Sequence, residues 1–476
     1  MDSLETKKTL TFPSLSSKHE QAHQQMPVVR PTRKRYFILF LYVALNTLKS
    51  FQWICYACIT NVIASFYGVS NLAVNSTTIL FMVTYLLLAL PVDLIMSRIG
   101  LRNSVLIGGA GTTLGVVIKC FSCRPDGFYV GMVGHLLVGL TEPFFFSIYS
   151  QVAAVWFPDD EVAFATSVGV LGDQIGIAIG FIVPSLMVGD DINDSLAIEQ
   201  GLFRLFLGLA IISAIITLLI VVSFDEQPPF PPGLARFNAI SKSKKAEGEQ
   251  QGRNGETATD NNQSSWAVEV SKKIDEVGGF VLDKNFLTLL IAVGISNGTN
   301  IAFHTILNQV IMGAEGWENN IDVVSNAGLI LILLGMLGSI FVGCLLDKYH
   351  KYKATAVWTH LLSVLGMASV VGSLELGSQV VLCIVVGVFG FSVTGHFCCS
   401  FDYAVEICYP KSERLSATLL NMSGQVFGIF VSVVGSIVVD NYGNHACIAL
   451  LVLVLTVGFV ITCLQGGKLK RQDAVQ

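Results

Sequence analysis

Apolar residues occur in long runs from residue 36 almost to the end of the chain, and short polar segments separate the runs. A helix needs about 20 apolar residues to cross the hydrocarbon core of a bilayer. Twelve runs reach that length, so we predict twelve membrane-spanning helices. Their expected limits are residues 36–65, 75–96, 101–121, 128–154, 161–188, 201–223, 284–312, 322–346, 353–374, 378–406, 411–438 and 443–464.

One long polar segment divides the spans into two sets of six. It contains the sequence KAEGEQQGRNGETATDNNQSS, whose composition is typical of a disordered linker. No cleavable signal sequence is visible in the polar, basic residues before the first span. We therefore predict an all-α membrane protein in five parts. They are an N-terminal tail (1–35), a six-helix bundle (36–223), the linker (224–283), a second six-helix bundle (284–464) and a C-terminal tail (465–476).

Composition and charge support this prediction and orient it. Of the 476 residues, 52% are hydrophobic and only 13% are charged, whereas a soluble protein carries about 25% charged residues. Lysine and arginine gather in both tails, in the linker and in loops on the same side, which the positive-inside rule places in the cytoplasm. Asn75 and Asn193 then lie in glycosylation sequons on the outer side, and we expect a plasma-membrane protein.

The two halves repeat one another at a shift of 252 residues. WFPDDEVAFATSVGVLGDQIG begins at Trp156, and CYPKSERLSATLLNMSGQVFG begins at Cys408. Both contain glycines four residues apart, at 172 and 176 and at 424 and 428, a spacing that allows close helix approach. Repeats on both sides of a central loop indicate a transporter built of two similar bundles, with chance similarity of apolar helices as the alternative.

The loop after the eighth span resembles the signature loop of the major facilitator superfamily, through Gly343, Asp347 and Lys348. The copy after the second span keeps Arg98 and Gly100 but has serine in place of the usual aspartate. The resemblance implies that both are gating loops. Seven further motifs are similar to the feline leukaemia virus subgroup C receptor (FLVCR) family: FQWICY, IKC at 118–120, VWF at 155–157, LGDQIG at 171–176, LNQ at 307–309, AVEICYP at 404–410 and LLNMSGQVFG at 419–428.

The resemblance implies a transporter of choline and ethanolamine, and some members of the family are described as haem transporters. It also implies that Trp53, Gln174 and Gln425 line the central substrate site. Tryptophan suits a quaternary ammonium, which has no hydrogen to donate and is attracted to ring faces. An amide inside a membrane helix faces a partner or a cavity, and helix packing remains the alternative for both glutamines.

The chain departs from the family pattern at several of the candidate site positions. Asn300 and Ile301 stand where an aromatic pair is usual, so an aromatic cage would be incomplete unless Phe303 or His304 completes it. Lys49 and Asp173 each stand where asparagine is usual. These departures put choline in question as the substrate.

A charge at the centre of a span costs about 2.5–3.5 kcal/mol on insertion scales. Two opposite charges about 4 Å apart gain roughly 4 kcal/mol at an effective dielectric constant of about 20. We therefore predict an ion pair between Lys49 and Asp173. The alternative is that Lys49 faces a watery cavity alone and binds an anionic group, which would favour an anionic or zwitterionic metabolite. Glu142 in the fourth span is a candidate coupling site for protons, and a packing role is equally open.

Other functions receive less support from the sequence. A haem carrier would need a wide cavity and an axial ligand, for which His304 and His396 are candidates if they face one cavity; helix-to-helix hydrogen bonding is the alternative. No nucleotide-binding glycine loop or metalloprotease motif is present, and two Cys-x-x-Cys pairs lack matching partners. We expect no enzyme, resident cofactor, metal site or nucleic-acid partner. A membrane receptor that does not transport is the alternative of a different class.

Overall fold

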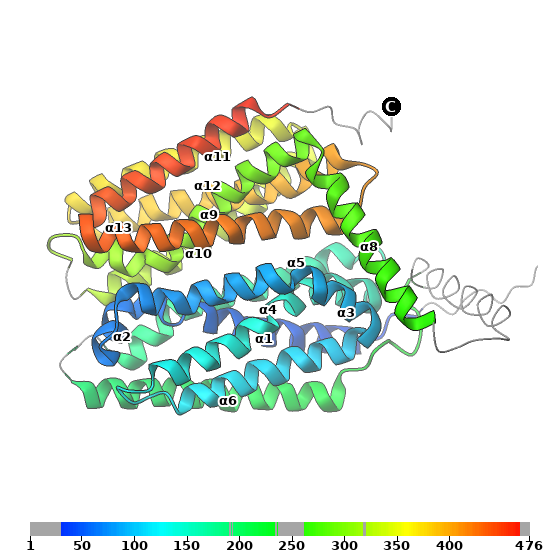
Figure 1. The fold of residues 1–476 in the computed structure, drawn as a ribbon, viewed down its shortest axis with the longest axis horizontal. Helices are drawn as coiled ribbons and strands as arrows, with labels where there is room; N and C mark the ends of the chain where they lie inside the picture. The colour runs from blue at the N-terminus through cyan, green and yellow to red at the C-terminus, as the bar shows by residue number, and fades with distance from the viewer. Residues whose placement is uncertain are drawn as a thin grey trace, which may run out of the picture.

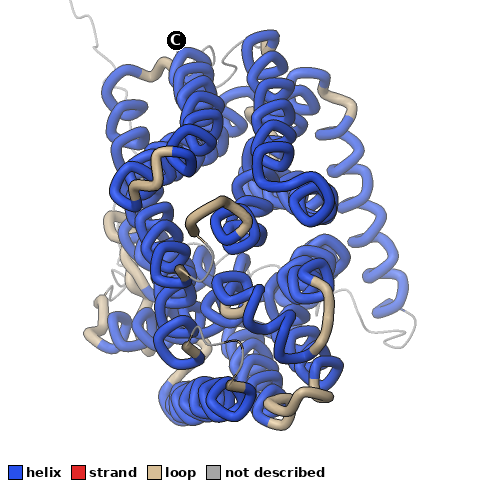
Figure 2. The backbone as a smooth tube through the Cα atoms, turned by 90° about the vertical axis from the view of Figure 1, so that its left-hand side faces the viewer, coloured by secondary structure: helices blue, strands red, loops and turns tan. Residues whose placement is uncertain are grey.

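The computed structural model describes residues 30–466, apart from 190, 191, 193, 234, 235, 237–260, 318 and 319. The described chain is helical and contains no strand (Figure 2). Ten stretches of it are long and apolar enough to cross a membrane. The elements are α1 (Lys34–Ile54), η2 (Ala57–Ile59), α2 (Thr60–Tyr67), α3 (Asn71–Cys120), α4 (Phe128–Trp156), α5 (Val162–Val188), α6 (Ser195–Ser223), α8 (Asn261–Val281), α9 (Lys284–Met312), α10 (Ile321–Tyr349), α11 (Tyr352–Glu375), α12 (Gln379–Cys408) and α13 (Glu413–Leu464).

Two of these helices each contain two predicted spans. The 50 residues of α3 would extend about 75 Å as one helix, far beyond the hydrocarbon core of about 30 Å. Gly100 in α3 and Gly443 in α13 both have φ +84°, a conformation that glycine adopts at little cost. The orange and red parts of α13 accordingly lie antiparallel in Figure 1. All twelve predicted spans are therefore found as helices, which confirms the predicted fold class.

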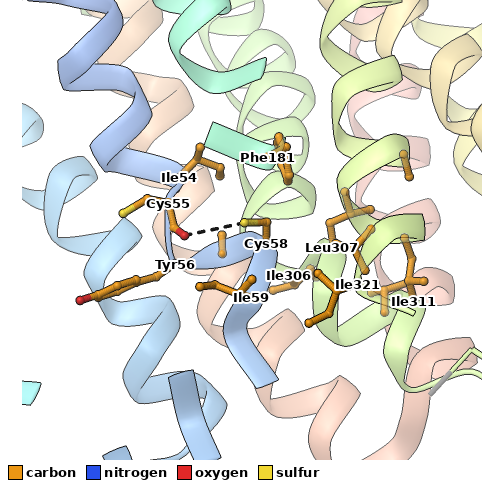
Figure 3. Close-up of a cluster of buried hydrophobic side chains, with 14 of the residues drawn as sticks. Ile54, Cys55, Tyr56, Cys58, Ile59, Phe181, Ile306, Leu307, Ile311 and Ile321 are labelled. Carbon is orange, nitrogen blue, oxygen red and sulfur yellow. Dashed lines mark hydrogen bonds between the residues drawn. The ribbon is translucent and has the colours of Figure 1, made fainter. Parts of the chain in front are cut away.

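The two halves lie side by side, the first from blue to green and the second from green to red in Figure 1. We refer to the left and right of that view as the α2 end and the α8 end. At the α2 end, apolar side chains of both halves form one buried cluster (Figure 3). It includes Ile59 and Phe181 of the first half and Ile306, Leu307 and Ile321 of the second.

The first predicted span, 36–65, is broken rather than continuous, because η2 separates α1 from α2. Non-helical backbone at membrane depth needs protein partners for its polar groups. Asn308 of α9 supplies them, since its Nδ2 donates to the Cys58 carbonyl oxygen at 2.9 Å and its Oδ1 accepts from the Asn61 amide at 3.3 Å. The Cys58 thiol donates to the Gly180 carbonyl oxygen at 3.4 Å. The break is thus held by one helix from each half.

Close backbone approaches join the first and fifth helices in both halves. A Cβ atom on Gly176 of α5 would lie 2.3 Å from the Thr47 carbonyl oxygen of α1. A Cβ atom on Gly298 of α9 would lie 2.6 Å from the Gly428 amide nitrogen of α13. Each half therefore packs its first helix against its fifth with almost no side chain between them, as the glycine spacing predicts.

The prediction of a disordered linker is wrong for its last part, which forms α8. Within its described side chains, Phe280 is buried and Val277 is partly buried in a cluster with Phe286 and Leu289 of α9, whereas Ile274 is exposed. In Figure 1, α8 runs across the ends of both halves. Lys273 Nζ lies 2.8 Å from Asp93 Oδ2 of α3, and Lys411 Nζ donates to the Gly279 carbonyl oxygen at 2.6 Å. The helix thus contacts both halves.

Candidate functional site

A cavity of about 170 Å³ lies between the two halves. Its walls come from α1, α3, α4 and α5 of the first half and from α9, α10, α12 and α13 of the second. Eight side chains predicted from the sequence line it: Lys49, Trp53, Glu142, Asp173, Gln174, Asn300, His304 and Gln425. Residues from opposite ends of the chain therefore meet at one place, which is the arrangement expected of a substrate site between two repeats.

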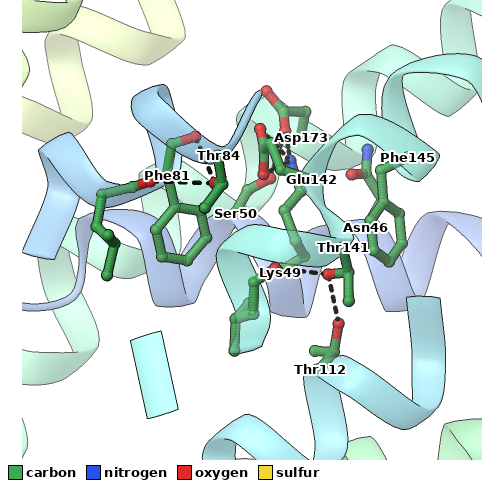
Figure 4. A network of polar contacts seen from close by, with 12 residues as sticks. Asn46, Lys49, Ser50, Phe81, Thr84, Thr112, Thr141, Glu142, Phe145 and Asp173 are labelled. Atoms are coloured by element: carbon green, nitrogen blue, oxygen red, sulfur yellow. Dashed lines mark hydrogen bonds and ion pairs between the residues drawn. The ribbon is translucent and has the colours of Figure 1, made fainter. Parts of the chain in front are cut away.

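Three charged side chains converge on one wall of this cavity (Figure 4). Lys49 Nζ lies 2.8 Å from Asp173 Oδ1 and 3.1 Å from Glu142 Oε2. The Ser50 hydroxyl donates to the same Asp173 oxygen. The predicted contact between Lys49 and Asp173 is present, and Glu142, which the sequence offered as a separate candidate, belongs to the same cluster.

The local structure explains how this cluster forms. Lys49 and Trp53 are one helical turn apart and therefore share a face of α1, and both line the cavity. The close packing of α1 against α5 brings Asp173 within reach of Lys49. The rings of Phe145 and Phe146 lie 5.8 and 5.4 Å from Lys49 Nζ, which adds a favourable cation–π contact. The lysine side chain is only 2% exposed, so this ammonium group contacts protein rather than water.

Phe303 does not reach the cavity, so the expectation that it could complete an aromatic cage is wrong. Its side chain is buried, and its ring packs against Phe389 with the centroids 5.4 Å apart. Asn300 and His304 are one helical turn apart and face the cavity, whereas Phe303 turns toward α12. His304 instead contacts Trp53 edge-on, with the ring centroids 6.2 Å apart.

The two histidines considered as haem ligands do not face one cavity. His304 lines the central cavity. His396 is buried within the second half, where its Nδ1 lies 3.1 Å from the Ala356 carbonyl oxygen and its ring lies 4.5 Å from that of His360. Since α12 presents His396 to α11 and not to α9, the structure assigns it a packing role between helices.

Asn75 is also placed differently from the sequence prediction. It is 1% exposed, and its Nδ2 donates to Gln309 Oε1 at 2.6 Å and to Ser436 Oγ at 3.1 Å. A glycan has no room there in this conformation, because the side chain lies between the two halves. The other sequon residue, Asn193, lies outside the described residues.

These contacts of Asn75 belong to a seal between the halves at the α2 end. Asp440 Oδ1 accepts from Asn71 and from Gln309, both at 3.0 Å. Ser325 donates to Ser185 at 2.8 Å. Together with the apolar cluster of Figure 3, these hydrogen bonds close the α2 end.

A second cavity of about 460 Å³ lies toward the α8 end. It is bounded by α3, α4 and α13, and it shares Phe146 and Asn421 with the central cavity. In the described conformation the central cavity is therefore closed off at the α2 end and adjoins a larger cavity toward the α8 end.

The predicted gating residues lie in the turn of α3 and near the end of α10. Gly100 forms the turn, and the amides of Leu101 and Arg102 both donate to Glu226 at 2.7 Å. Glu226 was missed from the sequence, although a carboxylate is favourable at a helix N-terminus. Arg98 lies 3.2 Å from Glu269 of α8. In the matching loop, Gly343, Asp347 and Lys348 lie in the last turns of α10.

Asp93 was also missed from the sequence. Its carboxylate contacts Lys273 of α8 and Arg414 of α13. The contact joins α3 to the linker helix and to the second half at the α8 end. Arg414 also lines the wider cavity, so this ion pair lies at the wall of that cavity.

Comparison with known proteins gives consistent matches. Residues 39–425 match the model of the Major Facilitator Superfamily. The chain is 32% identical to the choline/ethanolamine transporter FLVCR2 of Homo sapiens, over 95% of this chain and 81% of that protein. It is 34% identical to the choline/ethanolamine transporter flvcr2a of Danio rerio, over 93% and 89%. Among solved structures, a bacterial homolog to the human lysosomal transporter Spinster, inward-facing and unoccupied, matches with a TM-score of 0.67 and 12% identity over 92% of this chain and 98% of that chain.

Proposed function

This chain belongs to the major facilitator superfamily and to its FLVCR family, and we propose that it carries a small organic cation of the choline and ethanolamine class by alternating access. The chain is thus a multi-pass membrane protein of a transporter family. One observation carries the proposal: Trp53, Gln174 and Gln425 line a single cavity between the two halves. The proposal includes no catalytic role for any residue.

The size of the cavity favours a small substrate. Pockets for drug-sized ligands measure about 300–1,000 Å³, whereas the central cavity measures about 170 Å³. Such a space suits an amino alcohol and is too small for haem in this conformation. Because His396 also lies outside the cavity, haem transport has less support.

The charges around the cavity favour a cation. Lys49 contacts two carboxylates, so it is not a free positive charge that could bind an anionic group. An anionic metabolite would instead meet the acidic side chains of Glu142 and Asp173, both of which line the cavity. This counts against a carrier of anionic metabolites.

We also propose that the α8 end faces the cytoplasm and that the protein resides in the plasma membrane. The positive-inside rule supports this orientation, because lysine and arginine are concentrated in the loops of that end. The described conformation, closed at the α2 end, would then have its cavity directed toward the cytoplasm.

Cysteine labelling tests the orientation. Arg124 lies in an exposed turn at the α2 end, and Lys351 is exposed at the α8 end. In intact cells, we expect an impermeant maleimide to label Arg124→Cys and to label Lys351→Cys only after permeabilisation, each compared with the unsubstituted chain. Labelling of Lys351→Cys from outside would reverse the proposed orientation.

Substitution of the cavity amides tests the function. Within the described residues no hydrogen bond is formed by the side chain of Gln174, and Gln425 Oε1 is buried without a partner. Both amides are therefore available to substrate. We expect Gln174→Ala and Gln425→Ala each to lower kcat/KM for labelled choline or ethanolamine about tenfold, the scale of one lost hydrogen bond, with surface expression near that of the unsubstituted protein.

Gln309→Ala is the matched control, because Gln309 holds the α2-end seal and does not line the cavity. We expect this change to lower the amount of folded protein and not only the transport of what remains. Equal losses of folded protein and activity in the Gln174 and Gln425 variants would favour a packing role. Absence of uptake by the unsubstituted protein at the cell surface would favour the receptor alternative.

A further inference from the structure

We propose that Lys49, Glu142 and Asp173 form an ammonium subsite that prefers a primary ammonium, which has N–H groups to donate, over a quaternary ammonium. This inference rests on the proposed function, because it assigns one wall of the same cavity. It concerns which member of the substrate class the cavity fits best.

The cluster has one cation for two acids. Lys49 lies within 3.2 Å of both carboxyl groups, so a single ammonium group serves two acids. A buried charge without a partner is costly. The side chain of Asp173 is 23% exposed and lines the cavity, so a cation in the cavity can approach it directly.

The cavity also offers hydrogen-bond acceptors that the protein leaves unused. Asp173 Oδ1 accepts from both Lys49 and Ser50, whereas no hydrogen bond within the described residues reaches Asp173 Oδ2. Asn300 Oδ1 and Gln425 Oε1 are buried without a donor. Buried acceptors of this kind need donors, which a ligand in the cavity can supply. A primary ammonium brings three N–H donors, as lysine does, and a quaternary nitrogen brings none.

The cavity offers few aromatic ring faces to a cation. Trp53 lines the cavity, but one of its neighbours is His304, which it meets edge-on. Asn300 presents an amide to the cavity, and Phe303 is turned away. Because a quaternary ammonium depends on ring faces for its attraction, it gains less here than a cation that can also donate hydrogen bonds.

A series of four amines tests this preference: ethanolamine, N-methylethanolamine, N,N-dimethylethanolamine and choline. All are cationic at neutral pH, and each added methyl group removes one N–H donor. Each amine competes with labelled ethanolamine for uptake by the unsubstituted protein. We expect the inhibition constant to rise along the series, by at least tenfold from ethanolamine to choline. Equal constants, or tighter binding of choline, would overturn the proposal.

Two substitutions locate the effect. Asp173→Asn should raise the KM for ethanolamine about tenfold and change the KM for choline much less. The difference between the inhibition constants of ethanolamine and choline should therefore become smaller. Glu406→Gln is the control, because Glu406 is also a buried carboxylate in a membrane helix but lies outside the cavity. In this variant the inhibition constant should rise from ethanolamine to choline as it does in the unsubstituted protein. If the inhibition constants of Asp173→Asn rise along the series as steeply as those of the unsubstituted protein, Asp173 does not form the ammonium subsite.

The outcomes separate the two proposals. If none of the four amines is taken up, the proposed function fails. If uptake occurs without the expected order, the proposed function stands and the subsite fails. The competition series uses the unsubstituted protein, so it decides the question even if Asp173→Asn folds poorly.

Discussion

Replacement of Lys49 by alanine is expected to destabilise the protein more than any single change to its acidic partners. The change leaves Glu142 and Asp173 together without a cation in a low-dielectric bundle. Removing one side of a buried ion pair costs about 3–5 kcal/mol. We expect a marked loss of folded protein and a large fall in the melting temperature of the detergent-purified protein.

Because Glu142 also contacts Lys49, it affects the expected stability of variants in which Lys49 or Asp173 is replaced by an uncharged residue. Asp173→Asn leaves Lys49 paired with Glu142, so it should cost much less than Lys49→Ala. The double change of Lys49→Asn with Asp173→Asn should recover little, because Glu142 then has no cation. Adding Glu142→Gln should restore most of the stability, since all three groups are then neutral.

Melting temperatures of the single, double and triple variants decide between these expectations. The coupling free energy from a double-mutant cycle on Lys49 and Asp173 measures their interaction directly. The cycle is measured in the Glu142→Gln background, in which no second acid remains; if the losses from Lys49→Asn and Asp173→Asn simply add there, the two residues do not interact.

Gly176→Ala is expected to have the second large effect. Its Cβ atom would lie 2.3 Å from the Thr47 carbonyl oxygen, and a backbone atom cannot move aside without shifting α1. Overpacking of this kind costs about 1–3 kcal/mol or more. The same shift would draw Lys49 away from Asp173, so we expect transport to fall together with the melting temperature.

Gly208→Ala provides the matched control for this prediction. Gly208 lies in α6 with no atom within 4 Å of a Cβ built on it. The same added methyl group should be tolerated there, since alanine also favours helix more than glycine does. Similar melting temperatures for the two variants would show that the contact of α1 with α5 is not tight.

Several features of this protein follow from the sequence alone. The twelve spans were predictable because the length of an apolar run is a local property that the bilayer thickness selects. The equivalent packing of the two halves was predictable because glycines four residues apart, at 172 and 176 and at 424 and 428, mark the faces that approach closely. The contact between Lys49 and Asp173 was predictable because two charges in apolar helices need each other.

The tertiary structure decided which side chains share the site. In a membrane helix both the lipid-facing and the protein-facing sides are apolar, so hydrophobic periodicity does not reveal how the helix is rotated. That rotation places Asn300 in the cavity, turns Phe303 toward α12 and separates His396 from His304. It also adds Glu142 to the lysine cluster.

The packing of the two halves decided the burial of Asn75 and the docking of α8. Asn75 carries a sequon that can be read in the chain, but its burial depends on Gln309 and Ser436, more than 200 residues away. The docking of α8 depends on Asp93, whose partner Lys273 lies in the linker. Such contacts join segments that are distant in the chain, and only the packed arrangement of the helices brings them together.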